Sequence, residues 1–169
     1  MCGIFGYAGK RTDAGTLVID GLKNLEYRGY DSWGVACKDG DAINVEKDTG
    51  KISGVDSAQF TRECSLAVAH TRWATHGGVT KANAHPHLSG DGKIAVVHNG
   101  IIENYLELRD QLLSQGHKFA SETDSEIIPH LIEEKLKETD DFASAVRLTC
   151  RSLKGRYALL ALNTESNTL

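Results

Sequence analysis

Several features are scarce or missing in this sequence, and each absence narrows the class of protein. Only 2 of the 169 residues are proline, which excludes a proline-rich linker. No apolar run approaches the roughly 20 residues that a membrane-spanning helix needs. The N-terminus lacks a charged segment followed by a long apolar stretch, so it does not resemble a secretory signal peptide. We therefore expect a cytoplasmic protein with no membrane partner.

The charge and composition are those of an ordinary globular domain. The net charge is −4, and the 19 Lys and Arg residues are scattered without forming a basic block. Nucleic acid is therefore not expected as a partner. A chain of 169 residues with 40% hydrophobic residues can bury a sizeable core in one domain.

The four cysteines, Cys2, Cys37, Cys64 and Cys150, are widely and irregularly spaced. The absence of a C-x-x-C pair argues against a zinc ribbon or a thioredoxin-type site. In a cytoplasmic protein such cysteines are expected to be free thiols. Cys37 and Cys150 stand in apolar stretches and are expected in the core. Only Cys2 occupies an unusual position.

Hydrophobic periodicity predicts strands and helices in blocks rather than in strict alternation. Thr12 and Thr123 are candidate N-caps, and Gly116 is a candidate helix stop. Such blocks favour sheets packed face to face with helices outside. A long loop rich in Gly, His, Thr and Asn separates two of the strands, a common place for function. The predicted strands are 3–8, 34–37, 43–47, 65–70, 94–99 and 157–162, and the predicted helices are 13–25, 103–115, 124–137 and 141–153.

A cysteine at position 2 becomes the first residue when Met1 is trimmed. It then carries a thiol and a free α-amine, whose reference pKa of about 7.7–8.0 lets it act as a base near neutral pH. Nucleophile and base from one residue are the basis of N-terminal-nucleophile catalysis. Taken alone, however, Cys2 is more often a chance second residue than a catalytic one.

Further motifs favour a catalytic role for Cys2. Together with the N-terminus they resemble the class II glutamine amidotransferases, which are N-terminal-nucleophile hydrolases, and within them the glutamine–fructose-6-phosphate aminotransferases. Their order and spacing match that family from residue 1 to about residue 130. The segments are MCGIFG (1–6), EYRGYDS (26–32), HTRWATHG (70–77), NAHPH (83–87), HNGIIEN (98–104) and SETDSE (121–126).

The resemblance implies a nucleophile and an oxyanion hole. Cys2 would be the nucleophile and its α-amine the base. Asn99 and Gly100 follow a predicted strand, where an amide side chain and a backbone N–H can point to one spot, and the family uses them as oxyanion donors. Without the resemblance, an Asn-Gly pair is better explained as a tight turn.

The resemblance also implies binding groups for glutamine. The Arg72 guanidinium would hold the α-carboxylate, and Asp124 would hold the α-ammonium. Without it, Arg72 is a surface ion-pair residue and Asp124 a helix cap.

Three further residues would complete the glutamine site. Thr75 and His76 would contact glutamine largely through their backbones, and Trp73 would belong to a loop that closes over it, although Trp73 could equally be a core aromatic. Arg28 would support the nucleophile or line the site.

The implied fold class is α+β, a four-layer αββα sandwich of the N-terminal-nucleophile hydrolase type. Residues 1–169 would form a class II glutamine amidotransferase domain that is truncated at its C-terminus, without the sugar isomerase domains. The downstream isomerase module would be the partner that receives ammonia, and the resemblance is compatible with a homodimer. It implies no cofactor and no metal.

Three alternatives stay open at this stage. The chain could be another class II amidotransferase, or a glutamine-binding fragment without catalysis. The five histidines between His70 and His98 could bind a metal ion, but no H-x-x-x-H pair suitable for a helix occurs among them. A metal site is therefore the least favoured alternative.

Overall fold

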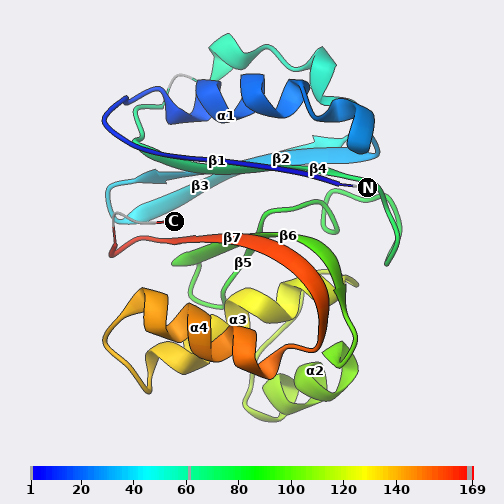
Figure 1. Cartoon of the computed structure of the whole chain (residues 1–169), viewed down its shortest axis with the longest axis vertical. Helices are drawn as coiled ribbons and strands as arrows, with labels where there is room; N and C mark the ends of the chain where they lie inside the picture. Colours follow the sequence, from blue (N-terminus) through cyan, green and yellow to red (C-terminus); the bar gives the residue numbers. More distant parts are fainter. Residues whose placement is uncertain (1, 61, 167–168) are drawn as a thin grey trace.

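The computed structural model describes residues 2–60, 62–166 and 169. Two antiparallel sheets lie face to face, and helices cover both outer faces (Figure 1). The first sheet has the strand order β1-β4-β2-β3, and the second has the order β5-β6-β7. The strands are β1 (Gly3–Ala8), β2 (Ser32–Asp39), β3 (Ala42–Thr49), β4 (Leu66–Arg72), β5 (His87–Leu88), β6 (Ile94–Ile102) and β7 (Gly155–Asn163).

In the described part of the chain, one α-helix packs on the first sheet and three pack on the second; Figure 1 shows them on the outer faces. The helix α1 (Ala14–Lys23) lies on the first sheet, and α2 (Tyr105–Ser114), α3 (Ile127–Leu136) and α4 (Phe142–Ser152) lie on the second. Short 3₁₀ turns occur at Glu26–Arg28, Ile52–Gly54, Ser57–Gln59 and Asp124–Glu126. The arrangement confirms the predicted αββα sandwich.

Both central strands are buried on both faces. In β4, Ala67 and Ala69 pack toward α1, whereas Val68 packs into the layer between the sheets. In β6, Ile94 and Val96 face the second helical layer, whereas the intervening residues face the first sheet. Small residues dominate the layer between the sheets, which lets the two backbones approach closely. Its buried members are Ala36, Val68, Ala95, Val97 and Leu162.

Every predicted helix and strand is present, with shifted ends. The structure contradicts the Thr12 cap, because α1 begins at Ala14 after Asp13. Thr123 precedes a 3₁₀ turn and makes no cap hydrogen bond; its hydroxyl lies 3.0 Å from Nε2 of His87 instead. Gly116 does follow α2 with a positive φ of 94°. A threonine hydroxyl can accept from a backbone N–H and so cap a helix, or it can hydrogen-bond a residue elsewhere in the fold. Hydrophobic periodicity does not distinguish these two possibilities.

Two further expectations need correction. Asn99 and Gly100 lie within β6 rather than after its end, because β6 continues to Ile102 in register with β7. Cys37 is buried as expected, but Cys150 is only half-buried, and the buried second thiol is Cys64. All four thiols are free.

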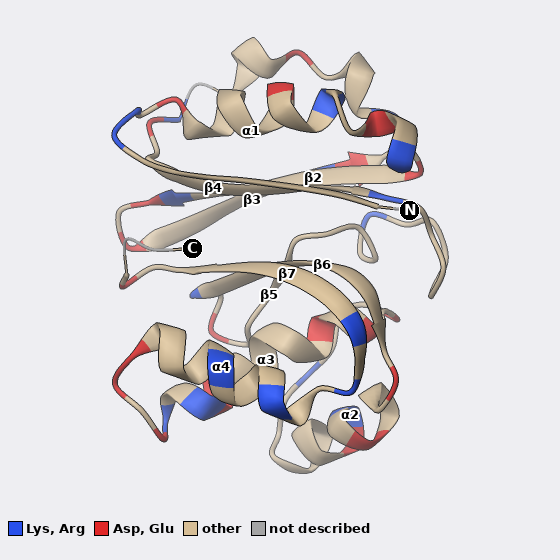
Figure 2. Cartoon of the chain, in the orientation of Figure 1, with Lys and Arg blue, Asp and Glu red and all other residues tan. Residues whose placement is uncertain are grey.

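Charged side chains lie mainly on the helices and connecting loops, where both signs are interspersed (Figure 2). The facing sheets carry few of them. Within the described residues, no helix is both long and apolar enough to span a bilayer.

Gly34 in β2 provides a test of this packing. A Cβ at this position would collide with the His85 carbonyl oxygen and lie 2.5 Å from Cβ of Lys47. Because backbone atoms cannot move aside cheaply, Gly34→Ala should lower the free energy of unfolding by about 1–3 kcal/mol in urea titrations. Gly54→Ala is the matched control, since a Cβ there meets nothing within 4 Å. Equal unfolding midpoints for the two variants would contradict the packing described.

Candidate active site

Cys2 lies where β1 begins, beside the end of β4. Gly3 is opposite Thr71 in the antiparallel β1–β4 register, so the residue before Gly3 comes opposite Arg72, beside Trp73. The Trp73 N–H donates to Sγ of Cys2 at 3.3 Å, and the thiol donates to the Trp73 carbonyl at 3.6 Å. The sulfur is thus held against the backbone of Trp73, the first residue after β4.

Asn99 crosses from the second sheet to the first. Its Nδ2 donates to the Cys2 carbonyl at 3.1 Å. Nε2 of His70 lies 2.9 Å from Oδ1 of Asn99 and 3.0 Å from the His98 carbonyl. Both of these oxygens are acceptors, so Nε2 of His70 must carry the proton. This tautomer turns the Asn99 carbonyl toward His70 and its NH₂ toward Cys2.

Gly100 follows with a positive φ of 124°. A Cβ there would collide with the Arg156 carbonyl of β7, so only glycine suits this close approach.

Arg72, the last residue of β4, is buried, and its guanidinium binds the next loop. It donates to the Gly78 carbonyl at 3.0 Å, to the Gly77 carbonyl at 3.4 Å and to the His76 carbonyl. Asn83 donates to the same Gly78 carbonyl at 3.0 Å. The cation therefore fastens the loop in the observed conformation.

Asp124 lies buried at the entrance to α3. Its Oδ2 accepts from the Ile102 N–H at 2.8 Å, and its Oδ1 accepts from the Ser125 hydroxyl at 3.3 Å. Oγ of Ser125 lies 2.7 Å from Nδ1 of His98. These contacts tie the carboxylate to Ile102 at the end of β6, three residues beyond Asn99 in the same strand.

A small cavity of about 30 Å³ brings the predicted site residues together. Every predicted site residue except Arg28 and Asn99 lines it, and Asn99 reaches it through its bond to Cys2. A space of this size holds about two water molecules. The lining residues are Cys2, His70, Arg72, Trp73, Thr75, His76, His85, His98, Gly100, Thr123, Asp124 and Ser125.

Arg28 does not line the cavity but contacts the backbone of a residue that does. Its Nε donates to the Cys2 carbonyl at 3.2 Å, in line with the predicted support of the nucleophile. Trp73 is 42% exposed and meets Tyr30 edge-on at 5.2 Å, so it is not a core aromatic. His76 meets Tyr105 edge-on at 4.8 Å.

Some contributors escaped the sequence analysis. Asp31 accepts from the Ala74 N–H at 2.8 Å, and its own N–H donates to the Arg72 carbonyl. His70 positions Asn99, as described above. Both residues stand inside the recognised motifs, but only their partners in space reveal what they do.

The histidines of the long loop and strands form a stacked, buried cluster. The rings of His70 and His85 are 4.2 Å apart and nearly parallel, and those of His85 and His87 are 4.6 Å apart. Burial lowers the pKa of His70 to about 3 and places the pKa values of His85 and His87 well below their usual range. Burial also lowers the pKa of His98, partly offset by Asp124. The cluster is therefore neutral near pH 7.

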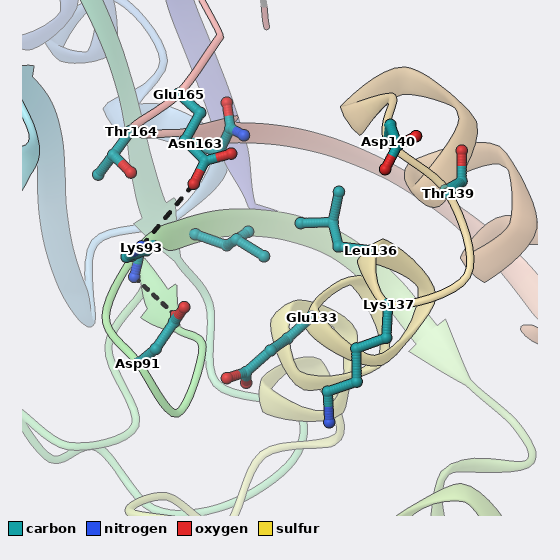
Figure 3. Close-up of a pocket in the computed structure, with 11 residues that line it drawn as sticks. Asp91, Lys93, Glu133, Leu136, Lys137, Thr139, Asp140, Asn163, Thr164 and Glu165 are labelled. Atoms are coloured by element: carbon teal, nitrogen blue, oxygen red, sulfur yellow. Dashed lines mark hydrogen bonds and ion pairs between the residues drawn. The ribbon is translucent and has the colours of Figure 1, made fainter.

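A larger cavity lies elsewhere. Its volume is about 410 Å³, and it is bounded by α3, the 139–140 segment and the end of β7. Figure 3 shows Glu133 and Lys137 projecting from α3 on one side of it, with Thr164 and Glu165 across from them. Asp91 and Lys93 also line it. Neither a cysteine nor a serine is among its lining residues, so size alone does not identify the reactive site.

Comparison with known proteins agrees with this geometry. A family model described as "Glutamine amidotransferase domain" matches residues 70–169. The chain belongs to this family. Glutamine–fructose-6-phosphate aminotransferase [isomerizing] from Methanococcus maripaludis is 48% identical over 172 residues, and its counterpart from Sulfolobus acidocaldarius is 51% identical over 166. These alignments cover 98% and 96% of this chain but only 28% of each relative.

Solved structures of glutamine amidotransferases share the fold. The glutamine phosphoribosylpyrophosphate amidotransferase from B. subtilis, complexed with ADP and GMP, has a TM-score of 0.80 and 27% identity, covering 97% of this chain and 35% of that one. A structure described as the allosteric regulatory enzyme of purine biosynthesis has a TM-score of 0.82 and 28% identity, covering 97% and 36%. The predicted sandwich of the N-terminal-nucleophile type is thereby confirmed.

The neutral histidine cluster of this amidotransferase domain predicts acid sensitivity. In the unfolded chain a histidine titrates near pH 6.5, whereas His70 in the folded chain has a pKa of about 3. Below pH 6.5 the unfolded state therefore binds more protons, and stability falls as the pH falls. Between pH 7 and pH 5 His70 alone should lower the free energy of unfolding by about 2 kcal/mol.

Urea unfolding followed by circular dichroism at both pH values measures this loss. His85 and His87 should increase it, because their pKa values are displaced in the same direction. An unfolding midpoint that is unchanged between pH 7 and pH 5 would contradict a neutral cluster.

Proposed function

We propose that this chain is the glutamine-hydrolysing domain of a glutamine–fructose-6-phosphate aminotransferase and that Cys2 is its nucleophile. The observation that supports this most is the convergence of four distant segments on one cavity. Cys2, Arg72, Gly100 and Asp124 line a single cavity, and the Asn99 amide reaches the Cys2 backbone. A nucleophile, an oxyanion donor, a cation and an anion are together what hydrolysis of free glutamine requires.

In the proposed reaction the α-amine of Cys2 accepts the thiol proton, directly or through a water molecule. The thiolate attacks the side-chain amide carbon of glutamine to form a tetrahedral oxyanion. Its collapse breaks the C–N bond, the ammonium proton passes to the leaving nitrogen, and ammonia leaves a γ-glutamyl thioester. Water then hydrolyses the thioester to glutamate. Removal of Met1, which lies outside the described residues, is a condition of this mechanism.

Asn99 and Gly100 are proposed to bind the oxyanion. The Asn99 NH₂ already points toward Cys2, because His70 holds its carbonyl on the opposite side. A donor that is oriented before reaction costs no reorganisation when charge develops. The bend at Gly100 brings the backbone of β6 into the same cavity.

Arg72 and Asp124 are proposed to bind the α-carboxylate and α-ammonium of glutamine. Both charges are buried and lie on the same cavity. A guanidinium can offer two parallel N–H groups to a carboxylate. In the observed conformation it offers them to loop carbonyls instead, so substrate binding must replace some of these bonds.

Room for glutamine requires the loop 73–78 to move. About 30 Å³ holds roughly two water molecules and excludes an amino acid. This loop carries Trp73, Thr75 and His76, which we propose contact or cover the substrate. Gly77, with a positive φ of 76°, is suited to act as a hinge.

In the whole protein, ammonia would pass to fructose 6-phosphate on a downstream isomerase module and yield glucosamine 6-phosphate. Residues 1–169 would form one amidotransferase domain within a cytoplasmic enzyme, for which a homodimer is one possible assembly. The proposed hydrolysis uses only groups of this chain and requires no cofactor.

Glutamate release from glutamine tests the nucleophile and the oxyanion donor. Cys2→Ala should abolish turnover, because no other group on the cavity can form the thioester. Asn99→Ala should lower kcat about 10²- to 10³-fold. Cys150→Ala and Asn44→Ala are matched controls, since neither side chain lines the cavity.

Intact mass must be measured on the same samples to establish whether Met1 is absent. Turnover by Cys2→Ala would refute the proposed nucleophile. Processed, folded wild-type chain that binds glutamine without turnover would favour the alternative of a non-catalytic binding fragment.

Asp124→Asn tests the ammonium site separately. The asparagine carbonyl can still accept from the Ile102 N–H, but its negative charge is gone. Losing a charged hydrogen bond worth about 1.5–3 kcal/mol should raise KM for glutamine about 10- to 100-fold, with a smaller effect on kcat. Asp110→Asn on the exposed face of α2 is the control. An unchanged KM would exclude Asp124 from substrate binding.

A further inference from the structure

A second group of chemically capable side chains lies between α2 and α3, away from the cavity at Cys2. It consists of His117, which follows α2, and of His130 and Glu133 on α3. None of these three lines the cavity at Cys2. The five histidines considered for metal in the sequence analysis belong to the other cluster, so this group was not anticipated.

Three donor atoms converge in this group. Nδ1 of His117 and Nδ1 of His130 are 3.0 Å apart, and Oε2 of Glu133 lies 3.8 Å from the first and 3.7 Å from the second. A point equidistant from the corners of this triangle lies about 2 Å from each atom, close to the Zn–N and Zn–O bond lengths of about 2.0–2.2 Å. We propose that His117, His130 and Glu133 form a binding site for one divalent transition-metal ion, with Zn²⁺ as the best fit.

The surroundings of His117 match those of a metal ligand. Its Nε2 lies 2.7 Å from Oε1 of Glu134, and an ionised carboxylate can only accept, so Nε2 carries the proton. Nδ1 of His117 therefore presents a lone pair toward His130 and Glu133. A carboxylate behind the far nitrogen is the usual way in which proteins orient a metal-binding histidine. Lys137 binds the same Glu134 oxygen at 2.5 Å and helps to hold it in place.

The other two ligands are also held in position. The Glu133 carboxylate accepts from the Gly90 N–H at 2.9 Å through Oε2, the same atom that faces the histidines. The His130 ring is buried and packs edge-on against Phe119 at 4.9 Å. The side chains of His117 and Glu133 are 8% and 20% exposed. Rigid ligands with limited exposure favour specific binding over loose surface association.

Two imidazoles and one carboxylate are a donor set that suits zinc, and a water molecule would complete four-coordination. A cavity of about 360 Å³ lined by His117, Glu133, Glu134 and Lys137 gives solvent and metal access. Figure 3 shows Glu133 and Lys137 projecting from the same part of α3. The bound ion would join the segment after α2 to α3, whose entrance carries Asp124.

Metal binding to the chelator-treated 169-residue chain tests the proposal. The chain is dialysed against a small excess of Zn²⁺, and bound metal is measured by mass spectrometry. Cys2→Ala serves as the background, because it removes the half-buried Cys2 thiol, a possible competing metal ligand, without touching the proposed ligands. One Zn²⁺ per chain should remain in this background and in the control Glu138→Gln, an exposed acid just beyond the end of α3.

The ligand variants should lose the ion. Removing the supporting Glu134 as Glu134→Gln should weaken Zn²⁺ binding about 10- to 100-fold, and His117→Ala or Glu133→Gln should weaken it at least as much. Because His130 is fully buried and its removal could unfold the chain, the less buried His117 and Glu133 carry the test, with circular dichroism confirming that each variant is folded.

Co²⁺ in place of Zn²⁺ gives an independent readout. Visible ligand-field absorption without a sulfur charge-transfer band is expected, and it should disappear in His117→Ala. Failure of the Cys2→Ala chain to bind Zn²⁺ would overturn the proposal. So would Zn²⁺ binding by His117→Ala and Glu133→Gln that is as tight as binding by the chain with all three ligands. Neither result bears on glutamine hydrolysis, which is measured separately.

Discussion

The close packing of the two sheets is the constraint on which the site depends. A thin layer of mostly small side chains, including Val68 and Ala95, separates them. Only because the layer is thin can His70 of the first sheet reach Asn99 of the second, and Asn99 reach Cys2. Larger residues in this layer would push apart the two sheets that carry Cys2 and Asn99. The packing of the layer between the sheets therefore also determines the geometry of the proposed site.

The order of elements and the fold class could be predicted from the sequence, because both follow from apolar periodicity and from the resemblance of the motifs. Details that depend on tertiary partners could not. Thr123 has the chemistry of a helix cap but lies against His87. Asn99-Gly100 has the composition of a turn but continues β6, because β7 supplies the pairing. The local sequence indicates which structures a residue can adopt, whereas its partners in the folded chain determine which of them forms.

The same limit applies to the functional groups. The motifs predicted the residues that line the cavity, because Cys2, Arg72 and Asp124 each carry distinctive chemistry. They did not predict the contacts that orient these side chains. His70 appears unremarkable until its two acceptors are seen to determine its tautomer. The His117–His130–Glu133 group was missed for a related reason. His117 follows α2 whereas the other two ligands lie on α3, so only His130 and Glu133 have the sequence spacing of one helical turn.

The contact between Cys2 and Trp73 also bears on how easily the thiol is oxidised. Cys2 is half-buried, and its sulfur is bonded to the Trp73 backbone on a cavity that admits only about two water molecules, so part of its surface is closed to peroxide and other oxidants. The loop movement that admits glutamine would also expose the thiol to oxidation. If Cys2 is the nucleophile, a thiol uncovered mainly in the presence of substrate would meet the amide before it met an oxidant. The closed loop would then also limit irreversible oxidation of Cys2.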